Sequence, residues 1–255
     1  MCFFIANKGE KEMREQTELN EVKRIARMLL MTKIHETEYA PAIVQHPFTS
    51  TGIWAIPNGD KLRLMDLIKN REDLREWRNH IQEQIDRAET ASEIYRMTNK
   101  PYGMCFLKYT MPYLSREEYT KILADAWIRS ENPNNDSNLN KKELVAMFQA
   151  ADPAILMGES EKQQLAELEN PVTVYRGVTS YNGRRIKWLS WTLEKSIAEW
   201  FAHRFGEGGT VYEAQIKKEH IFALFMGRQE YEVIVNPAHL LNIGEAEELS
   251  MQQTQ

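Results

Sequence analysis

The chain has 255 residues, enough for one large domain or two modest ones with a substantial core. Its 42% hydrophobic and 27% charged residues are ordinary for a soluble globular protein. The net charge of -5 argues against a protein that binds nucleic acid mainly through bulk electrostatics, although it leaves room for a local basic cleft.

The spacing of the cysteines and the lengths of the apolar stretches indicate the cellular compartment. Cys2 and Cys105 are far apart in the sequence, so two thiols in a reducing environment are a simpler interpretation than one disulfide. Residues 1–6 are apolar but too few for a signal peptide, and they lack its basic leader. No stretch is long enough to span a bilayer. We therefore expect a cytoplasmic protein without a membrane segment.

The first part of the chain has mainly helical patterns. Apolar residues recur at spacings of three and four over residues 10–32 and again over 60–97, which predicts two helical segments. Between them, residues 37–60 contain Pro and Gly at short intervals, which indicates a loop that includes one strand. Residues 99–103 are the expected linker.

This linker divides the chain into a mainly helical N-terminal domain, 1–100, and a second domain, 101–255. The second domain begins with a short strand or buried segment at 104–109. Its pattern then changes from helical to strand-like, which predicts an α+β fold. The expected helices are 115–128, 141–149, 160–168 and 193–205, and the expected strands are 172–178, 187–190, 210–216, 220–225 and 231–235.

Residues 132–143 imitate the ligand spacing of an EF-hand calcium loop. The first ligand would be Asn132, and Ser137 replaces the glycine that the sharp turn needs. An Asn-rich turn that caps the next helix is therefore the preferred interpretation. The histidines show no ligand spacing either, so the sequence predicts no metal site.

Two carboxylates precede the last apolar run. In a strand over 231–235, Glu230 and Glu232 would point to the same face, because strand side chains alternate. Like charges side by side cost free energy unless a ligand or an acid/base task uses them. A solvated strand face is the alternative interpretation.

A cation and two hydroxyl groups stand at other strand ends. Arg176 follows Val172 and Val174 on one face, so its guanidinium should be buried and should need an anionic partner such as a pyrophosphate. Gly177 would let a ligand approach the main chain. The alternatives are a structural Arg paired with a core carboxylate and, for the Ser190-Trp191-Thr192 corner, simple helix capping.

The order and spacing of these motifs resemble the Arg-Ser-Glu clade of mono-ADP-ribosyltransferases. The matching pieces are Tyr175-Arg176-Gly177, Ser190-Trp191-Thr192 and Glu230-Tyr231-Glu232. The likeness does not extend to residues 1–100. Trp191 and Thr192 depart from the small residue and Ser that many members have.

The resemblance implies a helical N-terminal region followed by a split β-sandwich with flanking helices, which binds NAD in its cleft as co-substrate and needs no metal. It implies that Arg176 holds the NAD phosphates and that the Gly177 main chain binds the nicotinamide carboxamide. Ser190 would orient Glu232, which acts on the nicotinamide ribose, while Glu230 acts on the acceptor. The other residues implied at the NAD site are Tyr175, Thr192, Phe201 and Phe205.

The implied activity is transfer of ADP-ribose from NAD to a macromolecule, with release of nicotinamide. A protein arginine is the favoured acceptor, because Glu at the first position of the Glu-x-Glu pair goes with arginine in this family; an RNA or DNA base is the alternative. Such transferases often serve as toxins, defence effectors or phage proteins, and residues 1–100 would then bind the target or an inhibitory partner. A competing hypothesis is a catalytically inactive relative that acts as a binding or adaptor protein.

Overall fold

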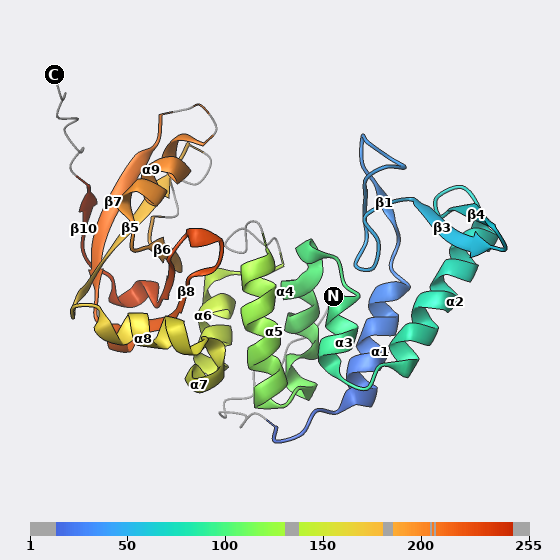
Figure 1. Cartoon of the computed structure of the whole chain (residues 1–255), viewed down its shortest axis with the longest axis horizontal. Coiled ribbons are helices and arrows are strands. Elements are labelled where there is room, and N and C mark those ends of the chain that lie inside the picture. The colour runs from blue at the N-terminus through green and yellow to red at the C-terminus, as the bar shows by residue number, and fades with distance from the viewer. Residues whose placement is uncertain (1–13, 131–137, 181–185, 205, 207, 247–255) are drawn as a thin grey trace. The chain divides into compact units, whose positions relative to one another are not determined.

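The computed structural model describes residues 14–130, 138–180, 186–204, 206 and 208–246 (Figure 1). A helical N-terminal and middle region is followed by a six-stranded antiparallel sheet with a helix, so the predicted α+β class is confirmed. The chain forms two compact units, 1–122 and 123–255, and the division falls inside one helix. The separate roles that the sequence assigns to 1–100 and 101–255 stay a prediction.

Unit 1 consists of helices and two small antiparallel sheets, β1–β2 and β3–β4. Its elements in chain order are α1 (Leu19–Leu30), β1 (His35–Glu36), β2 (Val44–Gln45), β3 (Ile53–Asn58), β4 (Lys61–Asp66), α2 (Arg71–Arg87), α3 (Ala91–Arg96), η1 (Lys100–Tyr102), α4 (Gly103–Thr110), η2 (Met111–Tyr113) and the start of α5 (Arg116–Arg129).

The prediction of one helical segment over 60–97 is wrong at its start. β3 and β4 form a hairpin through a two-residue turn, where Gly59 has φ +62°. In β4 the side chains alternate: Met65 is buried, whereas Leu62 and Leu64 are largely exposed. The helix begins only at Arg71, after an Asn70 side chain that caps its first turn.

The expected linker at 99–103 is also wrong, and residues 104–109 are the buried segment that was one of the two expectations, not the short strand. Residues 100–102 form a 3₁₀ turn that leads directly into α4, and most of α4 is buried. The Ser115 hydroxyl caps the next helix, α5, because it accepts the Glu118 N–H at 3.2 Å.

Unit 2 contains the end of α5, the large sheet and the helices around it. Its further elements are α6 (Lys141–Ala150), α7 (Pro153–Leu156), α8 (Glu159–Glu167), β5 (Val172–Val178), β6 (Ser190–Thr192), α9 (Lys195–His203), β7 (Thr210–Ile216), η5 (Lys218–His220), β8 (Ile221–Phe225), η6 (Gly227–Gln229), β9 (Glu232–Val235), η7 (Pro237–His239) and β10 (Leu241–Glu245).

Asn140 caps α6 through a capping box with Glu143, as an Asn-rich turn would. Asn132 and Ser137, the other positions of the imitated calcium loop, lie outside the described residues. The strand expected at 187–190 is wrong, since β6 starts at Ser190, and β10 was not expected. In the described part of the chain, no helix is long and apolar enough to cross a membrane.

The sheet has the strand order β10-β7-β5-β6-β9-β8. β5 pairs with β7 along its whole length, from Val172 opposite Ile216 to Val178 opposite Thr210. Its other neighbour, β6, pairs with it only at Tyr175 and Thr192. This single pair, which we call the seam, joins a β10-β7-β5 half to a β6-β9-β8 half.

One face of the sheet carries the core of unit 2, and α9 packs against β5 and β7 (Figure 1). The core joins both halves: Val174 and Ala214 come from one, Trp191 and Val233 from the other, and all four are at most 2% exposed. The seam is therefore backed by side-chain packing although it has little main-chain pairing.

Candidate functional site

The two carboxylates do not share a strand face, so that prediction is wrong. β9 begins at Glu232, whereas Glu230 ends the 3₁₀ turn η6 with φ -89° and ψ -15°. Between them Tyr231 has φ +45°, and Gln229 before them has φ +57°. Alternation with period two holds only inside a strand, and here the chain turns between the two carboxylates.

The corner between β6 and α9 holds this left-handed turn in place. The Thr192 hydroxyl donates to the Glu230 carbonyl at 2.7 Å and accepts the Glu194 N–H at 3.1 Å. The Leu193 N–H donates to the Tyr231 carbonyl at 3.2 Å. A non-glycine residue at positive φ is strained and persists only where its surroundings hold it. Thr192 therefore positions the segment that carries Glu230.

Glu232 is held by two side-chain donors on one of its oxygens. Ser190 pairs with Ile234 and Thr192 with Glu232, so Ser190 and Glu232 share a face of the sheet. The Ser190 hydroxyl donates to Oε1 of Glu232 at 2.5 Å, and the Trp127 Nε1–H donates to the same oxygen at 3.2 Å. The predicted orientation of Glu232 by Ser190 is thus present as a contact.

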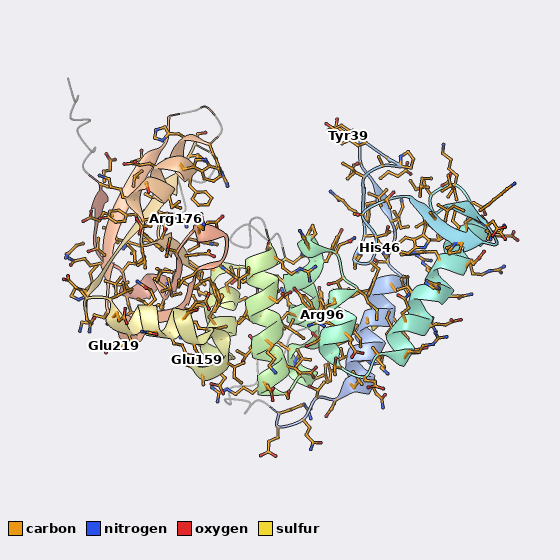
Figure 2. The ribbon with its side chains drawn as sticks, in the orientation of Figure 1. Tyr39, His46, Arg96, Glu159, Arg176 and Glu219 are labelled. Atoms are coloured by element: carbon orange, nitrogen blue, oxygen red, sulfur yellow. The ribbon has the colours of Figure 1, made fainter. Side chains whose placement is uncertain are left out.

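Arg176 reaches the same cluster from the other half of the sheet. Its Nη1 donates to the Ser190 carbonyl, and its buried Nε has no hydrogen-bond acceptor among the described residues. Burial lowers the pKa of Arg176 to about 10, while the nearby Glu232 carboxylate acts to raise it. The guanidinium is therefore still charged at neutral pH. Figure 2 labels Arg176 among the strands of unit 2. Arg176, Ser190 and Glu232 lie together, and we call them the Arg-Ser-Glu cluster.

Gly177 has a packing role that the sequence did not predict. A Cβ at this position would lie 2.1 Å from the Ala198 carbonyl oxygen and 3.0 Å from Cβ of Phe201. The absence of a side chain therefore lets α9 approach β5. This contact also brings Phe201 next to Gly177, and the Arg204 guanidinium lies over its ring at 5.1 Å. Phe205 lies outside the described residues.

Tyr175 faces away from Arg176, because neighbouring strand residues point to opposite faces. It stands opposite Glu213 on β7. Burial raises the pKa of Tyr175, and the Glu213 carboxylate raises it further. Among the described residues, no hydrogen bond links Tyr175 to the Arg-Ser-Glu cluster. Its place is at the seam.

Trp127 is the site residue that the sequence did not reveal. It lies on α5 and is 1% exposed, with its ring edge-on to Phe148 at 4.9 Å. Phe148 in turn stacks on Phe222 of β8 at 5.9 Å. A buried indole N–H needs an acceptor, and Glu232 supplies it. The two residues are 105 positions apart, and no motif spacing connects them.

Comparisons with known proteins assign no family. No family model matches the chain, and neither a curated protein nor a solved structure matches it. In the described ranges, no group of three or more His, Cys, Asp or Glu side chains could hold a metal ion. The function has to be inferred from the residues of the site.

Proposed function

We propose that this chain is an NAD-dependent mono-ADP-ribosyltransferase, which moves ADP-ribose from NAD to a macromolecular acceptor and releases nicotinamide. One observation carries the proposal: Arg176 on β5, Ser190 on β6 and Glu232 on β9 form one hydrogen-bonded cluster. These residues, in this order along the chain, are the ones by which the sequence resembles the Arg-Ser-Glu clade. We further propose that the two halves of the sheet, joined at the seam, correspond to the two sheets of a split β-sandwich.

The state of Arg176 supports a dinucleotide as the ligand. A partly buried guanidinium whose Nε has no acceptor among the described residues retains capacity for an anion, and the diphosphate of NAD offers suitable oxygens. Gly177 adds a second contact. On the side of β5 that faces β6, no described strand pairs with residues 176–178. Main-chain polar groups there need other partners, which the nicotinamide carboxamide would provide beside Phe201.

Glu232 is suited to the bond-breaking step. NAD supplies an ADP-ribosyl group whose bond to nicotinamide breaks as positive charge develops on the ribose. A carboxylate fixed in advance at this place stabilises that charge. The Ser190 and Trp127 donors hold Glu232 in one orientation through Oε1. We propose no metal for the reaction.

Glu230 has the separate role of aligning or deprotonating the acceptor. The Thr192 hydroxyl holds the main chain of Glu230 by donating to its carbonyl. The left-handed turn at Tyr231 then separates Glu230 from Glu232. By the resemblance, an arginine side chain is the favoured acceptor, with an RNA or DNA base as the alternative. A cytoplasmic toxin, defence or phage effector is the corresponding biological role, in which residues 1–100 bind the target or an inhibitory protein.

The test is incubation with labelled NAD and cell lysate, followed by separate protease and nuclease digestion. Wild type should label a macromolecule, whereas Glu232→Ala should not; Glu245→Ala, an exposed change on β10, is the matched control. Mass analysis of the labelled fraction identifies the acceptor. No labelling by wild type, or equal labelling by Glu232→Ala, would contradict the proposal.

NAD binding separates an enzyme from an inactive relative. A ligand at about 100 times its Kd stabilises the native state by ~2.7 kcal/mol, which a thermal-shift titration detects. NAD should stabilise wild type but not Arg176→Ala. That outcome would support an NAD site at Arg176, whereas no stabilisation of either form would favour the adaptor hypothesis.

A further inference from the structure

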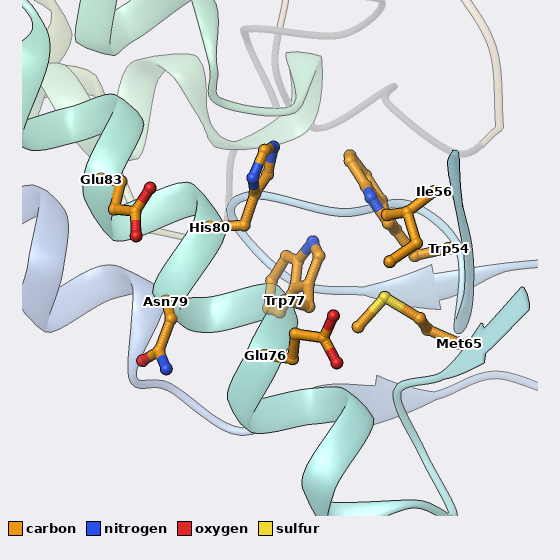
Figure 3. Close-up of a pocket in the computed structure, with 8 residues that line it drawn as sticks. All are labelled: Trp54, Ile56, Met65, Glu76, Trp77, Asn79, His80 and Glu83. Atoms are coloured by element: carbon orange, nitrogen blue, oxygen red, sulfur yellow. The ribbon is translucent and has the colours of Figure 1, made fainter. Parts of the chain in front are cut away.

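Unit 1 contains a separate cavity of about 240 Å³ between the β3–β4 hairpin and α2 (Figure 3). Cavities that hold drug-sized ligands measure roughly 300–1,000 Å³, so this one suits a single side chain rather than a dinucleotide. It is lined by Trp54, Ile56, Met65, Glu76, Trp77, Asn79, His80 and Glu83.

Two indole rings form the walls. Trp54 and Trp77 lie with their ring centroids 6.3 Å apart and their planes at 59°. Met65 stands opposite Trp54 in the hairpin, so both side chains face the helix. The result is an apolar space between two aromatic rings that are not parallel to each other, in which Trp54 is the more exposed ring and offers its face to a flat group.

The Trp77 indole N–H lacks a hydrogen-bond acceptor among the described residues. Its ring is 1% exposed, and its Nε1 is buried without a hydrogen-bond partner in the part of the chain that the structure describes. In Figure 3 the nitrogen edge of the ring faces the space between His80 and Trp54. Buried donors in native proteins normally have an acceptor, and leaving one without costs stability. A ligand that brings a carbonyl oxygen to this edge would supply it.

The rim of the cavity is acidic. Glu76, His80 and Glu83 lie on one face of α2 at positions i, i+4 and i+7, and both glutamates are exposed. The lining contains no Lys or Arg. Arg63 forms ion pairs with both Glu76, at 2.9 Å, and Asp73, at 2.6 Å. Arg87 forms a longer ion pair with Glu83, at 3.4 Å. The field at the rim therefore favours a cation and opposes a phosphate.

We propose that this cavity binds the side chain of an arginine supplied by a partner protein. The planar guanidinium stacks on the Trp54 face and lies toward Glu76 and Glu83, because tryptophan is the best aromatic partner for a cation and arginine the cation that stacks. The main-chain carbonyl of the same residue accepts the Trp77 Nε1–H. This inference goes beyond the proposed transferase and does not depend on it, since no residue of the Arg-Ser-Glu cluster takes part.

The test uses Nα-acetyl-arginine methylamide as the probe and the full chain as the protein. The indole N–H signals are followed by ¹⁵N–¹H NMR, with the Trp77 signal assigned through Trp77→Phe. The probe should shift the Trp77 signal saturably. The citrulline analogue, which has the same shape without the charge, should bind at least about tenfold more weakly.

Variants complete the test. Glu83→Gln should weaken binding several-fold, while Glu72→Gln, on α2 but outside the cavity, should not change it. Trp54→Leu should abolish binding, and its thermal unfolding shows whether the unit still folds. The inference is overturned if no saturable shift occurs in wild type, if citrulline binds as tightly as arginine, or if cytidine monophosphate binds more tightly than either.

Discussion

Replacement of Trp127 by Phe tests whether Glu232 is a positioned catalytic carboxylate. The substitution keeps a buried aromatic ring against Phe148 but removes the N–H that donates to Oε1 of Glu232 at 3.2 Å. Ser190 still donates to the same oxygen at 2.5 Å, so the carboxylate loses the Trp127 donor but not its whole support. We expect the variant to fold and to lose activity.

The expected loss follows from the strength of the bond. A hydrogen bond to a charged group contributes about 1.5–3 kcal/mol. Because the Trp127 contact is the longer of the two, the lower end applies, and ~1.5 kcal/mol corresponds to roughly a tenfold fall in kcat. The Kd for NAD should change little, since the contact acts on the orientation of Glu232 during bond cleavage. The assay is nicotinamide release at saturating NAD, with Kd measured separately by thermal shift.

A packing control distinguishes orientation from general damage. Phe222→Leu trims the same aromatic stack and removes no hydrogen-bond donor. It should lower stability without the tenfold fall in kcat. An unchanged kcat in Trp127→Phe would refute the role of Trp127, and so would an equal fall in Phe222→Leu at matched stability.

Three further predictions concern other parts of the chain. Thr192→Val removes the donor to the Glu230 carbonyl, so transfer to the acceptor should fall roughly tenfold while NAD hydrolysis to free ADP-ribose falls less, measured side by side on one NAD preparation. Gly177→Ala places a Cβ against the α9 main chain and should destabilise unit 2 by ~3 kcal/mol in urea unfolding, whereas Gly208→Ala, with open space around it, should be near neutral. His46 is fully buried, and desolvation lowers its pKa from 6.5 to about 4. Because the pKa of His46 is lower in the folded than in the unfolded state, the free energy of unfolding has its full value above about pH 6.5 and decreases as the pH falls to about 4. Unit 1 should lose roughly 3 kcal/mol of stability in that window. An unfolding free energy that does not change over this pH range would contradict the assignment.

The sequence predicted the elements whose pattern is purely local. β5 has the predicted bounds, 172–178, because buried and less buried side chains alternate along it, as is typical of a strand. The hairpin before α2 was not predicted, although its turn signal is also local. Leu62, Leu64 and Met65 fit helical spacing when counted as apolar, but Gly59-Asp60, the two residues between the strands, are a hairpin turn signal.

The site shows where such reasoning ends. Arg176, Ser190 and Glu232 could be selected from motif order, and the structure brings them together. The turn between Glu230 and Glu232 could not be predicted, since tyrosine rarely adopts a positive φ and the contacts that hold it come from another strand. Trp127 could not be predicted either, because its partner is set by tertiary packing alone.

The seam has a consequence for how ligand binding would change the local stability of the sheet. Among the described residues, one pair of the strand ladder, Tyr175 with Thr192, links the two halves of the sheet. Arg176 lies on one half, while Ser190 and Glu232 lie on the other. A molecule that contacts Arg176 and Glu232 at once is therefore a non-covalent cross-link between two three-stranded ribbons. Its arrival should slow amide hydrogen exchange in β6 more than in β7, which is already paired on both sides. Exchange in β6 would then report occupancy of the site before any acceptor is known.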